Sequence, residues 1–589
     1  MSTVVETDYL IVGAGPSGGA MACFLGQNGL KGIVISRDRG TADTPRAHLV
    51  NPFTFECLRD IGLEDEGMRL GITGKTLTGG LRWCRSMVGE EYGRTPAFGG
   101  QPENGADIKL ASPCEYADFP QSYMEPVLVK YATHHGFDFH FNTELVDAKR
   151  RTTGFECTVR GRTTKLEYTI HTKYLFAADG ARSAVARAFP FNFLTEPRDL
   201  SACNILIKAD LSHLMHSREA DLHFIMKPDR KWQLGHGACL RMVRPWHEWI
   251  VMVVGTGSNP LEGFTKDSPE LVECIKELIG DDTIDVEVLG LSPWSVRQTV
   301  AEKFSLDRDV FLAGDAAHRH PPAYGLGSNT CVQDAYNLAW KVAYVAKGYA
   351  GPALLDSYND ERQPVGADLV IQANQGVADH LAVWEALGMF EPPEAGMKII
   401  NDLYEPTPVG VERRQILHKA LERRRREAES IGLGMNQWYT SSAIYLDDET
   451  TPRPTVNGDV IVKPLITTYP GTRLPHAWLD ISTRRKEIST IDLAGHGSFC
   501  LLYGPGGKAW KEAATKIAAA TGVPIKAYGI GFGLDYIDLH RRWYEVREIE
   551  DDGCVLVRPD RYVAWRAKQM VEGCEDKLLH VLNKVLSRN

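Results

Sequence analysis

The feature that most constrains this chain is a glycine-rich turn close to its N-terminus. Gly13-Ala-Gly-Pro-Ser-Gly18 follows directly after the apolar run Asp8–Val12, and the small residues of Ala20–Leu25 come next. A second apolar run, Gly32–Ile35, completes a strand-helix-strand unit. A Gly-x-Gly-x-x-Gly pattern between a strand and a helix is typical of a turn that binds a dinucleotide. The sequence therefore predicts a β-α-β unit that holds a pyrophosphate.

Each residue of this turn has its own expected role. Gly13 permits the tight turn, Gly15 lets the backbone approach a pyrophosphate, and Gly18 lets the helix pack closely on the strand. Pro16 and Ser17 complete the turn, and the helix expected from Ala20 to Leu25 offers unpaired N–H groups at its N-terminus and the positive end of its dipole to the phosphates.

One element of the pattern is missing. An acidic residue that bonds the ribose hydroxyls is expected about 20 residues further on, but the chain has Ser36-Arg37-Asp38 there. The Ser36 hydroxyl can accept one ribose bond, while Asp38 lies further along the chain. We therefore expect Ser36 and Arg37 beside the ribose, with weaker anchoring than a carboxylate would give.

Two more glycine turns follow apolar strands later in the chain. Asp179-Gly180 comes after the first of these strands and Gly314-Asp315 after the second. The loop Gly325–Asn329 then precedes a long helix, which we expect from about Asp334 to Ala346. An aspartate at the end of a strand, followed by a glycine-rich loop that opens a helix, can bind a polyol and an anionic ring.

Composition excludes several classes of protein. With 589 residues the chain has room for about three domains, and its net charge of −10 disfavours nucleic acid as a partner. No run of about 18 uncharged apolar residues occurs, so we expect no membrane-spanning helix. The twelve cysteines are scattered singly without a Cys-x-x-Cys pair. That usage is typical of a reduced compartment, and we expect a cytoplasmic protein with no bound metal and no membrane partner.

Taken in order, the three glycine motifs resemble those of the class A flavoprotein monooxygenases, and the resemblance covers nearly the whole chain. Within that family, three phrases are similar to the phenol hydroxylase and dichlorophenol hydroxylase branch. They are Asp43-Thr-Pro-Arg-Ala-His-Leu-Val-Asn51, Arg241-Met-Val-Arg-Pro-Trp246 and Gly314-Asp-Ala-Ala-His-Arg-His-Pro-Pro322. The chain departs from the family at Ser36, and Arg187 closes the Asp179-Gly180 motif one place later than usual.

The resemblance implies an α/β fold: a Rossmann-like FAD-binding domain, an inserted β-sheet substrate domain and a C-terminal thioredoxin-like α/β domain. We expect the FAD-binding domain in two parts, with a β insertion near 80–118 in the first. The expected divisions are 1–187 and 291–365 for FAD, 188–290 for the substrate sheet, 366–450 for a helical segment and linker, and 451–589 for the thioredoxin-like domain. Because that last domain lacks Cys-x-x-Cys, we expect it to serve assembly, most simply of a homodimer.

The cofactors implied by the resemblance are tightly but non-covalently bound FAD, NAD(P)H as a transient co-substrate, and O2. Arg46 would lie along the pyrophosphate, Gln121 would contact the cofactor chain, and Asp179 would shape the nicotinamide cleft. Asp315 would bond the ribityl chain, while the loop of Gly325, Leu326, Gly327, Ser328 and Asn329 would present N–H groups to the flavin. The full set of predicted cofactor residues is Gly13, Gly15, Pro16, Ser17, Gly18, Ser36, Arg37, Arg46, Gln121, Asp179, Gly314, Asp315, Gly325, Leu326, Gly327, Ser328 and Asn329.

The implied reaction is hydroxylation of a small phenolic ring, most simply ortho to its hydroxyl, through a C4a-hydroperoxyflavin. The cofactor carries the oxygen chemistry, while the protein deprotonates the phenol, orients the ring and excludes water. The alternative is a tailoring monooxygenase that performs epoxidation, oxidative decarboxylation or ring rearrangement on a larger phenolic metabolite. A flavin-free binding protein of related fold would have degraded Asp315 and Gly325–Asn329, and both are intact here.

Five residues are candidates for the reaction itself. His48 is the predicted base, because a neutral imidazole has a pKa near ~6.5; the alternative is a loop histidine bonded to a backbone carbonyl. Trp294 is either an aromatic wall for the substrate or a core residue. His320 faces either the substrate or the loop, and Tyr324 either lies over the flavin or packs in the core. Pro321 lies where the family's backbone carbonyl meets the flavin peroxide or the substrate, whereas we expect His318 to be structural.

Overall fold

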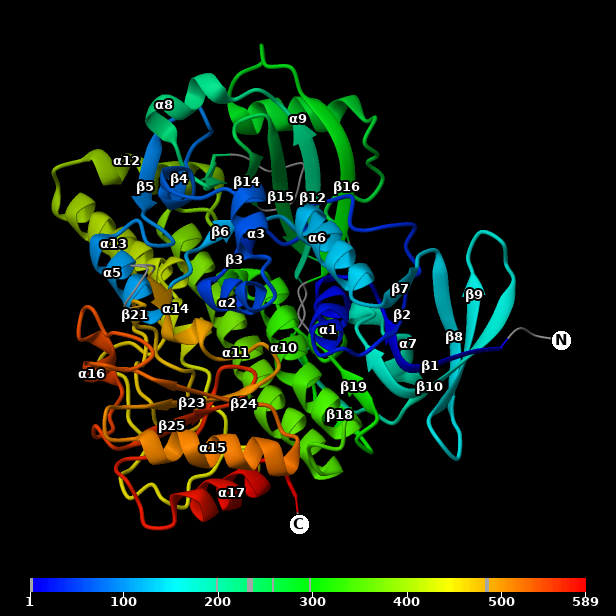
Figure 1. Ribbon diagram of the computed structural model, residues 1–589. Helices are drawn as coiled ribbons and strands as arrows, with labels where there is room; N and C mark the ends of the chain where they lie inside the picture. The colour runs from blue at the N-terminus through cyan, green and yellow to red at the C-terminus, as the bar shows by residue number, and fades with distance from the viewer. Residues whose placement is uncertain are drawn as a thin grey trace.

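A mainly parallel sheet forms the N-terminal half of the fold. The computed structural model describes residues 4–196, 200–229, 237–256, 259–295, 298–481 and 487–588, and Figure 1 shows their arrangement. The strand order is β18-β19-β10-β1-β2-β7, with β8 and β9 paired on the flank of β10. The bounds are β1 Val4–Val12, β2 Gly32–Ile35, β7 Phe137–His140, β8 Thr143–Arg150, β9 Phe155–Gly161, β10 Glu167–Ala177, β18 Ser305–Leu306 and β19 Val310–Leu312.

The buried ends of these strands explain why they form a covered parallel sheet. Tyr9–Val12 and all of β2 are buried, as expected when helices cover both faces. Helix α1 (Pro16–Gln27) packs on α10 (Gly327–Ala346) and on α6 (Gln121–His134). Ten residues of α1 are buried. The remaining helices of this part are α2 Pro52–Asp60, α3 Glu64–Leu70, α4 Lys75–Thr78, α5 Pro102–Ala111 and α7 Ala184–Ala188.

A second sheet of seven strands lies above the first in Figure 1. Its order is β16-β12-β15-β14-β13-β4-β5. The bounds are β4 Leu81–Cys84, β5 Glu91–Thr95, β12 Leu200–Lys208, β13 Leu222–Ile225, β14 Gly237–Arg244, β15 Glu248–Thr256 and β16 Glu287–Ser295. Both β4 and β5 therefore pair into the substrate sheet, although we expected the 80–118 insertion within the FAD-binding part. The expected boundary at 290 also falls inside β16.

Alternation of side chains gives this second sheet two distinct faces. Cys203, Ile205 and Ile207 of β12 pack in one apolar core with Leu271 and Ile275. The last two belong to α9 (Pro269–Ile279), which covers that face. The alternate residues of the strands face the FAD-binding part instead. The short helix α8 spans Met215–Arg218, and the strands β11 Phe193–Glu196, β17 Gln298–Ala301 and β20 His318–Arg319 form a separate three-stranded sheet that contacts α11.

Helices connect the FAD-binding part to the C-terminal domain. They are α11 Asp356–Ala386, α12 Pro393–Tyr404, α13 Pro408–Ala428 and α14 Ile431–Met435. The helical segment that we expected from 366 thus begins ten residues earlier, inside the predicted second FAD segment. In the part of the chain that the structure describes, no helix is both long and apolar enough to cross a bilayer.

The C-terminal domain is built on a four-stranded sheet of order β24-β23-β25-β26. Its strands are β23 Phe499–Tyr503, β24 Ile525–Gly529, β25 Cys554–Val557 and β26 Val563–Ala567, and its helices are α15 Lys508–Thr521, α16 Arg542–Val546 and α17 Cys574–Val585. A two-stranded pair, β21 Trp478–Leu479 and β22 Ile488–Ser489, precedes them. After β22 the chain turns into a 3-10 helix, Thr490–Asp492, because Ser489 and Asp492 form a capping box.

A buried charge cluster joins this domain to α10 and α11. Arg558 lies 2.5 Å from a carboxylate oxygen of Glu361 and 2.5 Å from one of Asp560. Lys341 of α10 reaches the same Glu361 at 2.7 Å. All four side chains are fully or almost fully buried, so each charge depends on its partners across the domain boundary.

Candidate active site

The three predicted glycine turns converge at the carboxyl ends of β1, β10 and β19. Gly13 has φ +106°, and a Cβ atom there would lie 2.1 Å from the carbonyl oxygen of Ala178. A Cβ on Gly314 would lie 3.1 Å from Cβ of Ser17. A larger residue at Gly13 would therefore push the first and second turns apart, and one at Gly314 would push against the start of α1.

Polar groups around this junction are left open in a way that fits a dinucleotide. Gly15 is the N-cap of α1 and supplies no side-chain cap, and the nearest atom to a Cβ there would be Glu125 Oε1 at 3.8 Å. Ser17 Oγ and Asp179 Oδ1 are buried without a hydrogen-bond partner in the described part of the chain. A helix N-terminus with free N–H groups beside unpartnered oxygens suits a pyrophosphate and sugar hydroxyls.

The two aspartates of the later turns differ in exposure. Asp179 accepts a 2.6 Å hydrogen bond from the Ala184 N–H, and burial raises the pKa of this carboxyl above its usual value. Asp315 is exposed at the end of its strand. Its neighbour Gly314 donates its N–H to Asp334 at 3.0 Å. The turn is thus fixed from behind, while the Asp315 carboxylate is free to meet a polyol.

On the predicted ribose side of the site, local hydrogen bonds hold the side chains. Ser36 Oγ accepts a hydrogen bond from the Asp38 N–H at 3.3 Å, and the side chains of Arg37 and Arg46 are exposed. Gln121 donates to Glu125 at 2.6 Å. The Ser36 hydroxyl keeps its hydrogen and a second lone pair for a ribose, so the predicted roles of Ser36 and Arg37 stay predictions.

Glu125 lies beside the predicted glycine turn, although sequence reasoning did not single it out. Besides the Gln121 amide, it accepts a 2.6 Å hydrogen bond from the Ala42 N–H, which ties the loop before Arg46 to α6. Burial raises the pKa of this carboxyl. Its position one turn into α6, four residues after Gln121, was the available signal.

The loop after Gly325 is partly helical. We predicted the helix from about Asp334, but α10 begins at Gly327, so Gly327, Ser328 and Asn329 form its first turn. The Asn329 amide is already occupied, because it donates to the Leu49 carbonyl at 2.8 Å and to the Gly325 carbonyl at 2.6 Å. Its oxygen accepts from the Asn51 N–H at 2.9 Å. The Asn329 side chain thus joins the turn to the strand that follows His48, and the backbone N–H groups of the turn stay the predicted partners of a flavin edge.

His48 is buried between the two sheets. It is 3% exposed, and its Nδ1 atom lies 3.2 Å from Oδ1 of Asp118. Asp118 in turn accepts a 3.0 Å hydrogen bond from Arg241, and Arg241 lies 3.6 Å from Asp221. Asp118, Arg241 and Asp221 were not predicted as site residues, although Arg241 begins one of the family-like phrases.

The charges in this cluster set its protonation. Burial and the Arg241 charge lower the pKa of His48, and Asp118 with the Pro45 carbonyl only partly offsets them. Burial alone would raise the pKa of Asp118, but Arg241 and His48 bring it down to about 2. Burial raises the pKa of Asp221 to about 7 despite the Arg241 charge. At neutral pH the imidazole is therefore uncharged beside an ionised Asp118.

Trp294 lies on the sheet face that is turned away from α9. Its Nε1 donates to Asn204 at 3.1 Å, and it is half-buried. The apolar residues Leu206, Val243 and Ile250 share this face and form a small cluster of their own. Because Arg241 precedes Val243 by two positions on β14, it points to the same side. Trp294 is therefore half-buried on the same face as Arg241, and both the aromatic wall and the core residue stay predictions.

Near the flavin loop, His318 and His320 make hydrogen bonds, whereas the ring of Tyr324 packs against α11. His320 Nδ1 lies 2.8 Å from the Pro321 carbonyl; since a carbonyl only accepts, Nδ1 carries the hydrogen. His318 is buried and bonds Asp334 at 2.9 Å, in agreement with a structural role. Tyr324 has φ +62°, and its buried ring packs against Gly376 of α11. Tyr324 also shares an apolar cluster with Leu326 of the predicted loop, and its hydroxyl is buried without a hydrogen-bond partner among the described residues, so both alternatives for Tyr324 stay predictions.

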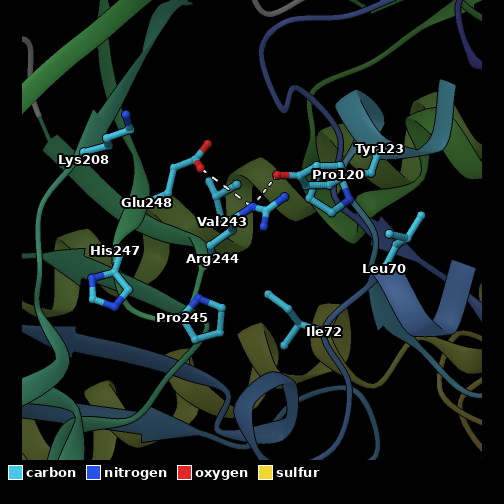
Figure 2. Close-up of a pocket in the computed structure, with 10 residues that line it drawn as sticks. All are labelled: Leu70, Ile72, Pro120, Tyr123, Lys208, Val243, Arg244, Pro245, His247 and Glu248. Atoms are coloured by element: carbon cyan, nitrogen blue, oxygen red, sulfur yellow. Dashed lines mark hydrogen bonds and ion pairs between the residues drawn. The ribbon is translucent and has the colours of Figure 1, made fainter. Parts of the chain in front are cut away.

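A groove of about 410 Å³ opens beside the buried cluster. Figure 2 shows Arg244 between Tyr123 and Glu248, with Ile72, Pro120 and Val243 around it. Arg244 donates to the Tyr123 hydroxyl and lies 4.4 Å from the centre of its ring. Ile72 exchanges backbone hydrogen bonds with Asp118 at 2.8 and 2.9 Å, so the groove borders the strand that carries the His48 partner. Among the described residues no group of three His, Cys, Asp or Glu side chains is placed to hold a metal ion.

Comparison with known proteins identifies the family to which this arrangement belongs. Residues 6–373 match a family model described as an FAD binding domain, and residues 467–589 match the C-terminal domain of aromatic-ring hydroxylases. The chain is 39% identical over 585 residues to phenol 2-monooxygenase of Pseudomonas sp. (strain EST1001), covering 99% of this chain and 93% of that one. It is 38% identical over 593 residues to 2,4-dichlorophenol 6-monooxygenase of Delftia acidovorans, covering 100% and 99%.

The solved structures agree with the sequences. The flavin-dependent monooxygenase PieE, in complex with FAD and substrate, superposes with a TM-score of 0.93 at 35% identity, covering 99% of this chain and all of the other. The predicted fold class and the predicted resemblance are therefore confirmed. The individual roles given to the site residues stay predictions.

Proposed function

The chain belongs to the FAD-dependent aromatic-ring hydroxylases, and from that premise we propose that it hydroxylates a small phenol ortho to its hydroxyl, using NAD(P)H and O2. The observation that carries the choice of a phenol is the buried, uncharged His48 imidazole. It lies at the junction between the FAD-binding sheet and the substrate sheet, where a ring would meet both. The phenol and dichlorophenol monooxygenases among its relatives support the same substrate class.

The residues present fit FAD. The open N-terminus of α1 at Gly15, with the unpartnered Ser17 and Asp179 oxygens, would hold the pyrophosphate and its neighbouring hydroxyls. The exposed Asp315 would bond the ribityl chain, and the backbone of the first turn of α10 would meet the flavin. FAD, once reduced by NAD(P)H, supplies the activation of O2 and the transfer of one oxygen atom to the ring.

The protein's own residues supply acid-base chemistry, orientation and exclusion of water. His48 accepts the phenol proton, which makes the ring electron-rich at its ortho and para carbons. Trp294 and its apolar neighbours on the sheet face flank the ring. The His320 N–H fixes the Pro321 carbonyl, so this carbonyl keeps one direction as substrate binds.

A substrate screen tests the proposal. Purified protein with FAD is given NADH or NADPH, air and either simple phenols or polycyclic phenols. We expect phenol-dependent oxidation of NAD(P)H and a product heavier by one oxygen atom, with the hydroxyl ortho to the original one. Turnover of the polycyclic phenols alone would establish the tailoring alternative. Oxidation of NAD(P)H without any oxygenated product would refute both.

We also propose a cytoplasmic homodimer. The absence of any disulfide among the twelve cysteines supports a reducing compartment. Light scattering should give twice the chain mass of 65.4 kDa; a single chain mass would exclude the dimer.

A further inference from the structure

We propose that Asp118 is the positioning residue of His48: it holds the imidazole through Nδ1, leaves Nε2 to accept the phenol proton, and balances the charge that results. Asp118 touches neither substrate nor cofactor in this role and acts only through His48. The inference rests on the proposed function, since it concerns how a phenol is deprotonated.

Two short strands bring the pair together. β3 (Leu49–Val50) pairs with β6 (Ala117–Asp118), and Leu49 lies directly opposite Asp118. The Phe119 N–H donates to the His48 carbonyl at 2.7 Å. This pairing fixes the backbone on both sides of the imidazole, so the 3.2 Å approach of Nδ1 to Oδ1 follows from strand register. Ile72 holds the Asp118 backbone from its other side.

The contact selects one tautomer of His48. An ionised carboxylate only accepts hydrogen bonds, and Asp118 is ionised at neutral pH because Arg241 and His48 hold its pKa near 2. The hydrogen of the neutral imidazole therefore lies on Nδ1, and Nε2 keeps its lone pair. In the described part of the chain, both ring nitrogens and Asp118 Oδ1 are buried outside strict hydrogen-bond geometry. Nδ1 nevertheless has the Asp118 carboxylate at 3.2 Å, whereas no ion pair of Nε2 is found among the described residues. A buried acceptor without a donor costs free energy, and a phenol O–H is a donor of the right kind.

The surrounding charges prepare the cluster for one extra proton. The charges that act most strongly on His48 are Arg241 of β14 and Asp118 of β6, and the same two act on Asp221. When Asp221 is protonated, the negative charge of Asp118 and the positive charge of Arg241 cancel. When the phenol O–H bond breaks and an N–H bond forms at Nε2, the phenolate and the imidazolium appear together. The imidazolium then faces the Asp118 carboxylate on one side and the phenolate on the other, so the total charge of cluster and substrate is unchanged by the transfer.

The geometry also explains why a neutral residue at position 118 would fail. An asparagine could turn its amide N–H toward Nδ1, which would move the imidazole hydrogen to Nε2 and remove the acceptor. The same change would leave the Arg241 guanidinium without its 3.0 Å carboxylate partner. Both effects disfavour the imidazolium, so the base would be lost without any change at His48 itself.

The test compares Asp118→Asn with wild type on two phenols. One phenol is protonated at pH 7.5, and the other, a nitrophenol, is already ionised at that pH. Because general-base catalysis is worth about 10²–10⁴-fold, we expect kcat for the protonated phenol to fall by about that factor. The nitrophenol needs no base and should keep a rate within a few-fold of wild type. The defect with the ordinary phenol should also shrink as the pH rises toward its own pKa.

Glu115→Gln is the matched control. Glu115 is exposed, lies three residues before Asp118 and undergoes the same carboxylate-to-amide change. It should leave both rates and their pH dependence unchanged. Asp118→Glu keeps the carboxylate and should recover part of the activity. Equal losses on both phenols in Asp118→Asn, with FAD content intact, would overturn the positioning role. Absence of phenol hydroxylation in wild type would instead refute the proposed function.

A measurement on the unmodified protein covers the case in which Asp118→Asn fails to fold. In protein labelled with 15N-histidine, the His48 signals are identified by their absence from His48→Gln. We expect the chemical shifts of an imidazole with hydrogen on Nδ1. Hydrogen on Nε2 would contradict the proposal, whatever the activity of the variants.

Discussion

Replacement of Arg362 by methionine is the sharpest test of how the flavin-binding turn is held. Arg362 is fully buried. Its Nε atom donates to Asp334 at 2.8 Å, and Nη1 donates to Gln437 at 2.6 Å and to Tyr439 at 3.0 Å. Asp334 is also the acceptor for the Gly314 N–H. The substitution therefore leaves a buried carboxylate without its countercharge directly behind the turn.

The expected magnitude follows from burial. Breaking a buried ion pair by removing one partner costs about 3–5 kcal/mol. Arg308→Met is the matched control, because Arg308 forms a 2.6 Å pair with Asp356 that is nearly half exposed. Exposed pairs contribute about 0.2–1 kcal/mol. Two Arg-to-Met changes with similar pair distances should thus differ several-fold in their effect.

Urea denaturation, followed by flavin fluorescence and by tryptophan fluorescence, measures both variants. We expect the free energy of unfolding to fall by about 3–5 kcal/mol in Arg362→Met. In Arg308→Met it should fall by less than about 1 kcal/mol. The dissociation constant for FAD should rise at least tenfold in Arg362→Met. A loss of about 1.4 kcal/mol in the free energy that holds the Gly314 turn in place corresponds to a factor of ten in that constant. Equal shifts for the two variants would show that Arg362 does not support the turn.

Three other perturbations address separate parts of the molecule. Gly13→Ala places a Cβ 2.1 Å from the Ala178 carbonyl and should yield folded but colourless protein, whereas a normal flavin spectrum would contradict the predicted turn. Trp294→Ala should raise KM for phenol several-fold and leave FAD content unchanged; an unchanged KM would return Trp294 to a structural role. Burial lowers the pKa of His223 to about 3, so the unfolded chain, with a histidine pKa near ~6.5, binds a proton that the folded chain refuses. The stability of the fold that depends on a neutral His223 is therefore fully present above pH ~6.5 and is lost as the pH falls toward 3. The unfolding midpoint of His223→Leu should accordingly depend less on pH, between about 6.5 and 4, than that of wild type.

Sterically dictated features could be predicted from the sequence. Gly13 and Gly18 permit no side chain, because a Cβ at either would lie within about 2.1 Å of a backbone oxygen. Such constraints are local in the chain and leave a pattern that can be recognised. The continuous apolar runs of β1 and β2 predicted a covered parallel sheet for the same reason.

The His48 environment depends on partners that local patterns do not reveal. Asp118 lies 70 positions after His48, and they meet through two strands of two residues each. Strands that short have no periodicity to recognise. Asn329 illustrates the same difficulty, since its side-chain amide bonds the carbonyl of Leu49, which is 280 positions away.

The buried cluster around Glu361 limits how the chain can be shortened. Glu361 and Lys341 belong to the first two-thirds of the sequence, and Arg558 comes from the last strand pair. A protein cut ahead of residue 558 would leave that carboxylate with one cation in place of two inside an apolar interior. The FAD-binding part therefore depends on the C-terminal domain for its stability. Limited proteolysis that removes this domain should yield an insoluble fragment and no smaller active enzyme.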